Sequence, residues 1–155
     1  MQSLAKNSDI ANGSPLDMEK EFIPNYMEID VALPGVMTCR LNAPLYYGNA
    51  EYVMNEMLSI VRTSSPRIRW FILRFDSLGD VDYIAAKRIM ELADRMGREQ
   101  VALVFVGLST DLKHFLADCG VFGVVAPDNV FTSLDAALTA LKHCATDDER
   151  GRKMS

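Results

Sequence analysis

The residues best suited to chemistry are three aspartates that stand close together in the chain, Asp76, Asp80 and Asp82. They follow an apolar run that predicts a buried strand, and they lead into a predicted helix. Ligands of open α/β sheets often bind at this place. Paired carboxylates there could hold Mg²⁺ or transfer protons. One hypothesis for this chain is therefore a small enzyme that uses these aspartates.

Other features of the same segment favour a structural role. Gly79 is not where a calcium-binding loop needs its glycine, and the glutamate that closes such a loop is missing. Asp82 directly precedes the helix, where an aspartate commonly caps the first turn, and helix N-termini attract acidic residues in general. We therefore favour a strand-to-helix connection capped by Asp82 over a metal site.

No other set of side chains has the spacing of a catalytic site. His114 and His143 fall on separate predicted helices, and neither has a cysteine or a second histidine at ligand spacing. The sequence contains no Gly-x-Ser-x-Gly elbow and no glycine-rich phosphate loop after a strand. We expect no cofactor, no bound metal and no enzymatic activity.

The composition is that of an ordinary globular protein. The 155 residues carry a formal net charge of −5 and no long basic stretch, which makes nucleic acid an unsuitable partner. Three cysteines without a Cys-x-x-Cys pair, Cys39, Cys119 and Cys144, fit reduced thiols in a cytosol. The apolar stretch 101–108 is too short to cross a bilayer, and the start lacks the apolar run of a signal peptide. These features predict a cytoplasmic protein.

The chain divides into a central domain with a loose segment at each end. Residues 1–20 are rich in serine, asparagine, aspartate and glycine and show no apolar period, which is typical of a flexible segment. Residues 146–155 are similarly polar, so we expect a flexible tail there. The domain itself is expected over residues 21–145.

Strands and helices alternate through this domain. Two strands at 27–33 and 36–41, separated by a Pro-Gly turn, predict an antiparallel hairpin. Nearly continuous apolar runs at 70–75 and 101–106 suit strands covered on both faces, and a helix at 82–97 lies between them. This pattern predicts a right-handed βαβ unit, whose two strands are parallel neighbours and whose helix covers one face.

The remaining elements are mostly helical. Asn49 is expected to cap a helix that runs to about Arg62, and Ser109 or Thr110 to cap a short helix that ends at Gly120. A short strand at 130–131 precedes a final helix, which begins after Ser133. The predicted fold class is α/β, with one mixed, mostly parallel sheet of about five strands and about four helices.

One segment of the chain resembles a known family. Pro34-Gly35-Val36 leads through a strand with Arg40 to residues 42–51, which read Asn-Ala-Pro-Leu-Tyr-Tyr-Gly-Asn-Ala-Glu. This resembles the opening of the STAS domains at the carboxyl end of SulP anion transporters, and the likeness covers about residues 27–141. The motif positions carried by this resemblance are Ala43, Pro44, Leu45, Tyr46, Tyr47, Asn49 and Ala50.

The motif also has a structural explanation. Pro44 cannot donate to a sheet ladder, so it ends a strand or lies at an edge. Gly48 permits a close approach, and Asn49 is placed to cap the helix. Tyr46 and Tyr47 are expected to pack beneath the loop. We favour this structural role over a ligand-binding one.

The resemblance implies where a phosphorylation switch would lie. STAS proteins that antagonise anti-sigma factors carry Asp-Ser-Ser-Gly or Asp-Ser-Thr-Gly at a helix start, and a kinase phosphorylates the second hydroxyl residue. The matching run here is Asp82-Tyr83-Ile84-Ala85. Because Ile84 has no hydroxyl, we expect no switch at this position. Tyr83 could in principle be modified, but a packing or rim role is favoured.

Two classes of function are compatible with this resemblance. The first is a non-catalytic regulatory and interaction domain of a SulP-like transporter of sulfate, bicarbonate or dicarboxylate, located at the inner face of the plasma membrane. Its partner would be a transporter domain, either covalently linked or separate. The second is a free-standing signalling protein of the anti-sigma factor antagonist type. The motif favours the first, and the missing hydroxyl weakens the second. Weak nucleotide binding also remains open by the resemblance, although no phosphate loop supports it.

The family's partner-contacting region corresponds to residues 76–84. Val81, Tyr83 and Ile84 would supply apolar contact, while Asp76 and Asp80 would supply a charged rim beside Asp82. The alternative is a solvated loop, with Tyr83 and Ile84 turned inward.

Overall fold

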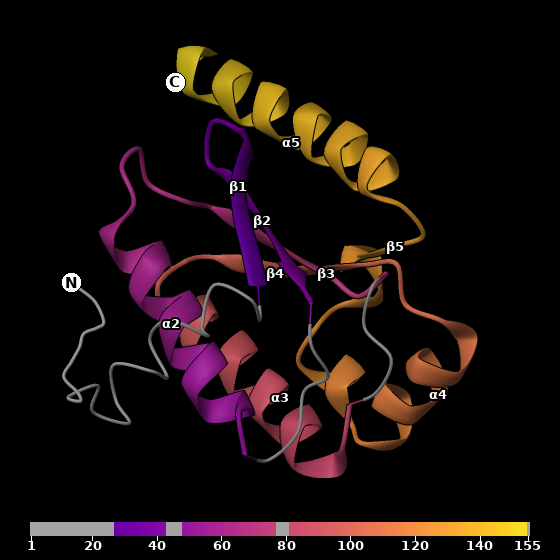
Figure 1. Cartoon of the computed structure of the whole chain (residues 1–155). Helices are drawn as coiled ribbons and strands as arrows, with labels where there is room; N and C mark the ends of the chain where they lie inside the picture. The colour runs from indigo at the N-terminus through magenta and orange to yellow at the C-terminus, as the bar shows by residue number, and fades with distance from the viewer. Residues whose placement is uncertain (1–26, 43–47, 77–80, 155) are drawn as a thin grey trace, which may run out of the picture.

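The computed structural model describes residues 27–42, 48–76 and 81–154. The segment 1–20 that we expect to be flexible lies outside these residues. The described residues form one five-stranded sheet in the order β1-β2-β3-β4-β5 (Figure 1). The strands are β1 (Met27–Leu33), β2 (Val36–Leu41), β3 (Trp70–Arg74), β4 (Ala102–Val106) and β5 (Val130–Phe131).

Four α-helices and two short 3-10 helices complete the described part of the chain. They are α2 (Ala50–Thr63), α3 (Tyr83–Arg98), α4 (Thr110–Asp118), η2 (Val121–Gly123), η3 (Pro127–Asn129) and α5 (Leu134–Met154). Three expected start and stop signals are confirmed. Ser109 and Ser133 accept hydrogen bonds from the first turns of α4 and α5, and Gly120 adopts a left-handed backbone with a φ of 88° after α4.

The sheet has the predicted mixed topology. β1 pairs antiparallel with β2 through a turn in which Gly35 has a φ of 81°, a conformation that favours glycine. The pairs β2–β3, β3–β4 and β4–β5 are all parallel. The prediction that residues 70–75 and 101–106 form parallel neighbours is confirmed.

Alternate residues of the strands point to opposite faces of the sheet, and each face is covered. Phe71 and Leu73 of β3 and Phe105 of β4 belong to a large apolar cluster, which also contains the buried residues of α2 and α3. Ile72 and Val104 point the other way and pack with Ala137 and Leu141 of α5. Figure 1 shows the resulting layers, with α2, α3 and α4 on one side of the sheet and α5 on the other.

The last helix is longer than the sequence pattern indicates. α5 continues to Met154, through residues 146–154, where we expect a flexible tail. Aspartate, glutamate, arginine and lysine fill most of this stretch, and three of these four types are good helix formers. A polar composition therefore does not end the helix here.

Candidate partner-binding surface

The acidic residues that follow β3 have different interaction partners. The Asp82 carboxylate accepts a hydrogen bond from the Ala85 backbone N–H at 2.8 Å, which confirms it as the cap of α3. The exposed Asp76 instead pairs with Arg74, with 3.3 Å between Oδ2 and Nη2. Asp80 lies outside the described residues. Asp76 and Asp82 therefore each have a structural partner.

The described residues also contain no group of three histidine, cysteine, aspartate or glutamate side chains that could hold a metal ion. Gly107, directly after β4, lies close to Asp76. A Cβ atom added to Gly107 would lie 3.1 Å from the Asp76 Cβ, and Gly107 has a φ of 78°. A larger residue at position 107 would therefore be strained and would push Asp76 outward.

The first turn of α3 presents two apolar side chains to solvent. Tyr83 is 54% exposed and Ile84 is 42% exposed. The Lys87 ammonium lies 5.0 Å from the centroid of the Tyr83 ring, a cation–π arrangement that holds the ring over the outer face of the helix. The alternative in which Tyr83 and Ile84 turn inward is therefore wrong.

Val81 differs from these two residues. It is only 8% exposed and belongs to the large core cluster beneath α3. Its expected role as an apolar contact on the surface is not what the structure shows. Position explains the difference, because Val81 precedes the capping residue and packs in the core, whereas Tyr83 and Ile84 lie on the outer side of the first helical turn.

The family motif is described only in part. Ala43, Pro44, Leu45, Tyr46 and Tyr47 lie outside the described residues. Ala50 is the first residue of α2 and is completely buried. Asn49 occupies the N-cap position, as expected, and is buried.

The side chain of Asn49, however, makes no capping hydrogen bond to the start of α2, so this part of the prediction is wrong. Its backbone explains why. Asn49 has φ −123° and ψ −16°, whereas Asp82 has φ −86° and ψ 174°, the extended conformation that aims a side chain at the first turn. The Asn49 carbonyl still accepts the Val53 N–H at 3.0 Å.

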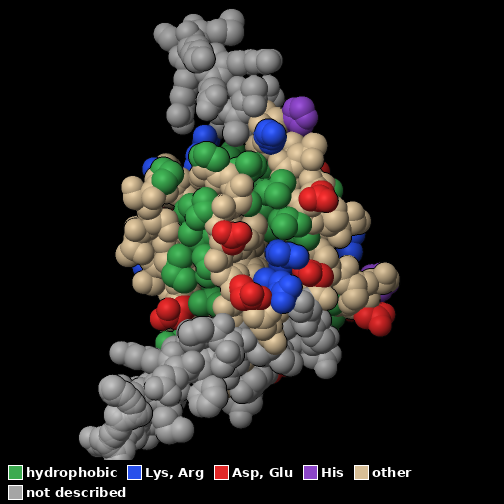
Figure 2. Space-filling view, turned by 45° about the horizontal axis from the view of Figure 1, so that its top comes forward, with side chains coloured by type: hydrophobic (Ala, Val, Ile, Leu, Met, Phe, Trp, Pro, Cys, Tyr) green, Lys and Arg blue, Asp and Glu red, His purple; other side chains and the backbone are tan. Residues whose placement is uncertain are grey.

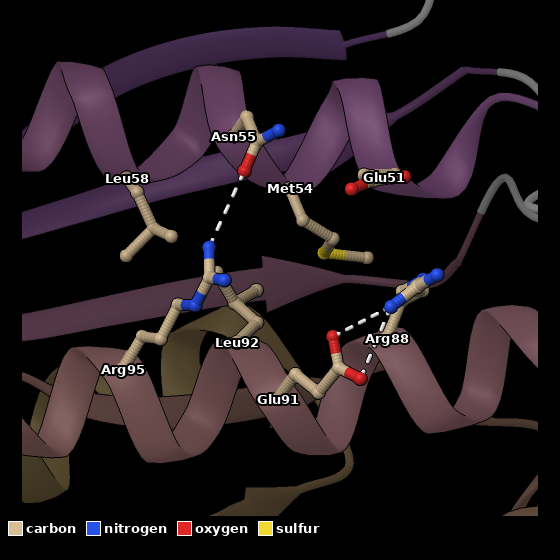
Figure 3. Close-up of a pocket in the computed structure, with 8 residues that line it drawn as sticks. All are labelled: Glu51, Met54, Asn55, Leu58, Arg88, Glu91, Leu92 and Arg95. Carbon is tan, nitrogen blue, oxygen red and sulfur yellow. Dashed lines mark hydrogen bonds and ion pairs between the residues drawn. The ribbon is translucent and has the colours of Figure 1, made fainter.

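Beside the candidate surface, α2 and α3 form a shallow groove (Figure 3). Its floor is apolar and is filled by Met54, Leu58 and Leu92, so little space remains for a ligand. Arg88 on its rim donates to both carboxylate oxygens of Glu91, at 3.1 and 2.9 Å. This pairing raises the pKa of the already basic Arg88. Ile84 precedes Arg88 by one helical turn, so the groove continues the surface that begins at the α3 start.

A row of charged residues that the sequence analysis did not assemble lies on the α5 side of the sheet. Arg40 and Arg74 are direct neighbours in the β2–β3 register. Arg40 pairs with Glu28 at 3.2 Å, and Arg74 with Asp76 at 3.3 Å. Figure 2 shows charged side chains of both signs gathered beside a hydrophobic area on one face of the molecule. The available sequence signal was Arg74 itself, which breaks an otherwise apolar strand.

Three cysteine thiols and both histidines lie within the part of the chain that the structure describes. Burial raises the pKa of the Cys39 thiol to about 12, so this thiol stays protonated at neutral pH. Burial also raises the pKa of Cys119, and the nearby Asp118 adds to that effect. His114 and His143 are exposed on α4 and α5 respectively. Among the residues described, no helix is long and apolar enough to cross a membrane.

Among curated proteins, this chain is similar to a part of a transporter. The chain is 26% identical over 110 residues to a probable sulfate transporter of Mycobacterium tuberculosis, and the match is the same in two strains. The aligned part covers 71% of this chain but only 20% of the transporter. The chain therefore corresponds to about a fifth of the length of these relatives.

The fold of this chain is shared by solved structures of a sulfate transporter family protein and of an anti-sigma factor antagonist. A sulfate transporter family protein from Wolinella succinogenes superposes with a TM-score of 0.64 at 21% identity, covering 76% of this chain and 93% of that one. An anti-sigma factor antagonist from Mycobacterium paratuberculosis superposes with a TM-score of 0.61 at 14% identity, covering 75% and 92%. At these identities the likeness concerns the fold alone.

The family model gives the most specific result. The model of the STAS domain matches residues 29–137, which include β1 from Ile29 onward, the strands β2 to β5, the helices α2 to α4 and the first turn of α5. This range also contains Asp82 and the exposed Tyr83 and Ile84. The chain belongs to the STAS domain family.

Proposed function

We propose that this chain is a non-catalytic regulatory and protein-interaction domain of a SulP-like anion transporter. Its partner is the membrane domain of that transporter, either covalently linked or separate, and it acts in the cytoplasm at the inner face of the plasma membrane. The transported anion belongs to the sulfate, bicarbonate or dicarboxylate class. The likeness to sulfate transporters over 110 residues supports the family of the partner.

One observation supports the place of contact. Tyr83 and Ile84 are both large and apolar, and both are exposed on the first turn of α3, although their neighbours Ala85 and Ala86 are fully buried. Helix capping needs Asp82 but does not need an apolar pair beside it. Exposed aromatic and aliphatic side chains with a charged border are typical of a protein interface. The proposed contact residues are Asp76, Asp80, Asp82, Tyr83 and Ile84.

The described residues offer nothing that favours an enzyme. Asp76 is paired with Arg74 and Asp82 caps α3, so neither is poised as a general base in a pocket. The groove between α2 and α3 has a filled floor. We propose that regulation here works through binding rather than through chemistry.

The test is a binding measurement with two variants. Tyr83→Ala combined with Ile84→Ser should weaken binding to the purified membrane domain of a SulP transporter by about 1–3 kcal/mol, while the melting temperature changes little. The matched control is Val124→Ser, because Val124 is 49% exposed but lies near the other end of α3. A large fall in melting temperature with unchanged affinity per folded molecule would contradict the proposal.

The alternative is a free-standing signalling protein of the anti-sigma factor antagonist type. The shared fold supports it, and the lack of a hydroxyl at Ile84 weakens it. Incubation with an anti-sigma-type serine kinase and ATP, followed by mass spectrometry, separates the two. We expect residues 82–85 to remain unmodified. Tight binding to the anti-sigma factor, without binding to the membrane domain, would favour the alternative.

A further inference from the structure

A hollow lies where α2 and α3 end and β3 and β4 begin, at the opposite end of the sheet from the start of α3. Its volume is about 310 Å³, and its polar lining consists of Arg62, Ser64, Arg67 and Glu99. Binding sites for small molecules in proteins have volumes of roughly 300–1,000 Å³. This hollow, which we call the arginine hollow, is therefore large enough for a small molecule only.

Printed distances join the two arginines through one residue. The Arg62 Nε lies 2.8 Å from the Glu99 Oε1, which links the end of α2 to the end of α3. Arg67 donates from Nη2 to the Glu99 backbone carbonyl at 2.8 Å. Both guanidinium groups are thus held at the border of the same hollow, although they come from different parts of the chain.

The ends of the helices explain part of this arrangement. Arg62 stands in the last turn of α2, where a cation complements the helix dipole, and Arg67 caps a carbonyl at the end of α3. A guanidinium group, however, has five N–H donors. Within the described part of the chain, Arg62 donates only from Nε and Arg67 only from Nη2. The other nitrogens of both side chains are available to a ligand.

The backbone of Gln100 gives a second indication. Gln100 has a φ of 63° and is the one described residue other than glycine with a positive φ. It follows the end of α3, where glycine would adopt this conformation without strain. Its side-chain oxygen accepts a hydrogen bond from the Arg67 Nη2 at 2.9 Å. A strained residue whose side chain holds an arginine beside a hollow is typical of a functional site.

The lining indicates the chemistry of a ligand. Two arginines and one glutamate give the hollow a net charge of +1, which is complementary to an anion with one charge. The two terminal nitrogens of Arg62 can hold a carboxylate through parallel hydrogen bonds. The apolar lining consists of Val61, Ile68 and Val101 and suits a short hydrocarbon chain. An inorganic anion would leave this apolar part unfilled.

We infer that the arginine hollow binds a short aliphatic monocarboxylate. Arg62 receives the carboxylate, Arg67 adds a second positive charge and a further donor, and the hydrocarbon chain lies against the apolar lining. Gln100 is a positioning residue that holds Arg67 in place. The inference does not rest on the proposed function, because this binding is measured on the chain alone and at the other end of the sheet.

The experiment is an NMR titration of the 155-residue chain with sodium butyrate at constant ionic strength. We expect saturable shifts of the Ser64 and Val101 amide signals and of the Ile68 methyl signals, because these residues line the hollow. The amide signal of Tyr83, at the other end of the sheet, should not move. The absence of shifts, or shifts that rise linearly without saturation, would overturn the inference.

Two further probes test the chemistry of the ligand. 1-Butanol has the hydrocarbon chain without the charge, and formate has the charge without the chain. Each should bind at least roughly fivefold more weakly than butyrate, because each lacks one of the two kinds of contact. Butanol that binds as tightly as butyrate would reveal a merely apolar hollow. Formate that binds as tightly would reveal a site for any small anion, and either result overturns the inference.

Variants of Arg62 locate the carboxylate. Arg62→Gln should weaken butyrate binding roughly tenfold, and Arg62→Lys roughly threefold, because lysine keeps the charge but not the pair of donors. The matched control is Arg98→Gln, since Arg98 also stands in the last turn of a helix but pairs with Asp94 and does not line the hollow. This control should change the affinity less than about twofold. Equal losses for Arg62→Gln and Arg98→Gln would show that overall charge is responsible.

Gln100→Gly tests the positioning role. Glycine adopts the left-handed backbone without strain, so the melting temperature of this variant should be no lower than that of the wild type. The variant also removes an acceptor of the Arg67 Nη2 and should weaken butyrate binding roughly threefold. A purely structural role of Gln100 predicts a change in melting temperature without a change in affinity, and that result would overturn the positioning role.

Discussion

The two ends of the parallel strands expose different chemistry. At the carboxyl ends, α3 begins with a capping aspartate and two exposed apolar side chains, Tyr83 and Ile84. At the amino ends, α2 finishes with Arg62 and α3 with Arg95 and Arg98 in their last turns. Helix dipoles account for the acidic cap at one end and for some of the arginines at the other. They do not account for the two adjacent exposed apolar residues, and for this reason we propose the start of α3 as the contact surface.

The largest expected effect separates the two faces of α3. Ile89 is completely buried, whereas Ile84 is 42% exposed on the same helix. Ile89→Ala should lower the free energy of unfolding by about 2–5 kcal/mol, because it leaves a cavity in the core. Ile84→Ala should change it by no more than about 0.5 kcal/mol. Urea denaturation of both variants measures the free energy of unfolding. A comparable loss of stability in the two variants would place Ile84 in the core.

A smaller effect is expected at the cap of α3. Asp82→Ala removes the acceptor of the Ala85 N–H and should lower the free energy of unfolding by about 1 kcal/mol. Asp82→Asn keeps an acceptor oxygen and should retain most of that stability. Thermal unfolding of the Asp82→Ala and Asp82→Asn variants compares their stabilities. If the alanine variant were as stable as the wild type, Asp82 would have a role other than capping.

The smallest effect is expected at the amino ends of the strands. Arg62 and Glu99 form an ion pair whose side chains are 54% and 36% exposed. A double-mutant cycle with Arg62→Ala and Glu99→Ala should give a coupling free energy of about 0.2–1 kcal/mol, and added salt should reduce it. A coupling that is larger and insensitive to salt would mean that this ion pair belongs to a structural network rather than to a solvated surface.

Local sequence signals predicted the fold and the cap well. The apolar runs of β3 and β4 revealed strands covered on both faces, and Asp82 stood directly before a helical period. Each of these features depends on residues close together in the chain. The outward direction of Tyr83 and Ile84 could not be decided in this way, because a first helical turn can face either the sheet or the solvent.

Other features depended on contacts between distant residues. The ion pair of Arg40 with Glu28 arises from the register of β1 and β2, and the ion pair of Arg62 with Glu99 arises from the packing of α2 beside α3. Asn49 appeared to be a side-chain cap, but its backbone conformation prevents the bond. The polar residues 146–154 appeared to be a tail, yet α5 continues through them.

The most direct measurement places a photo-crosslinking benzoylphenylalanine at Ile84 in cells that express the matching SulP transporter. The same group at Val124, a residue of similar exposure near the other end of α3, is the control. The account predicts an adduct with the membrane domain from position 84 and none from position 124. Adducts from position 124 alone would contradict the claim that the start of α3 is the contact surface.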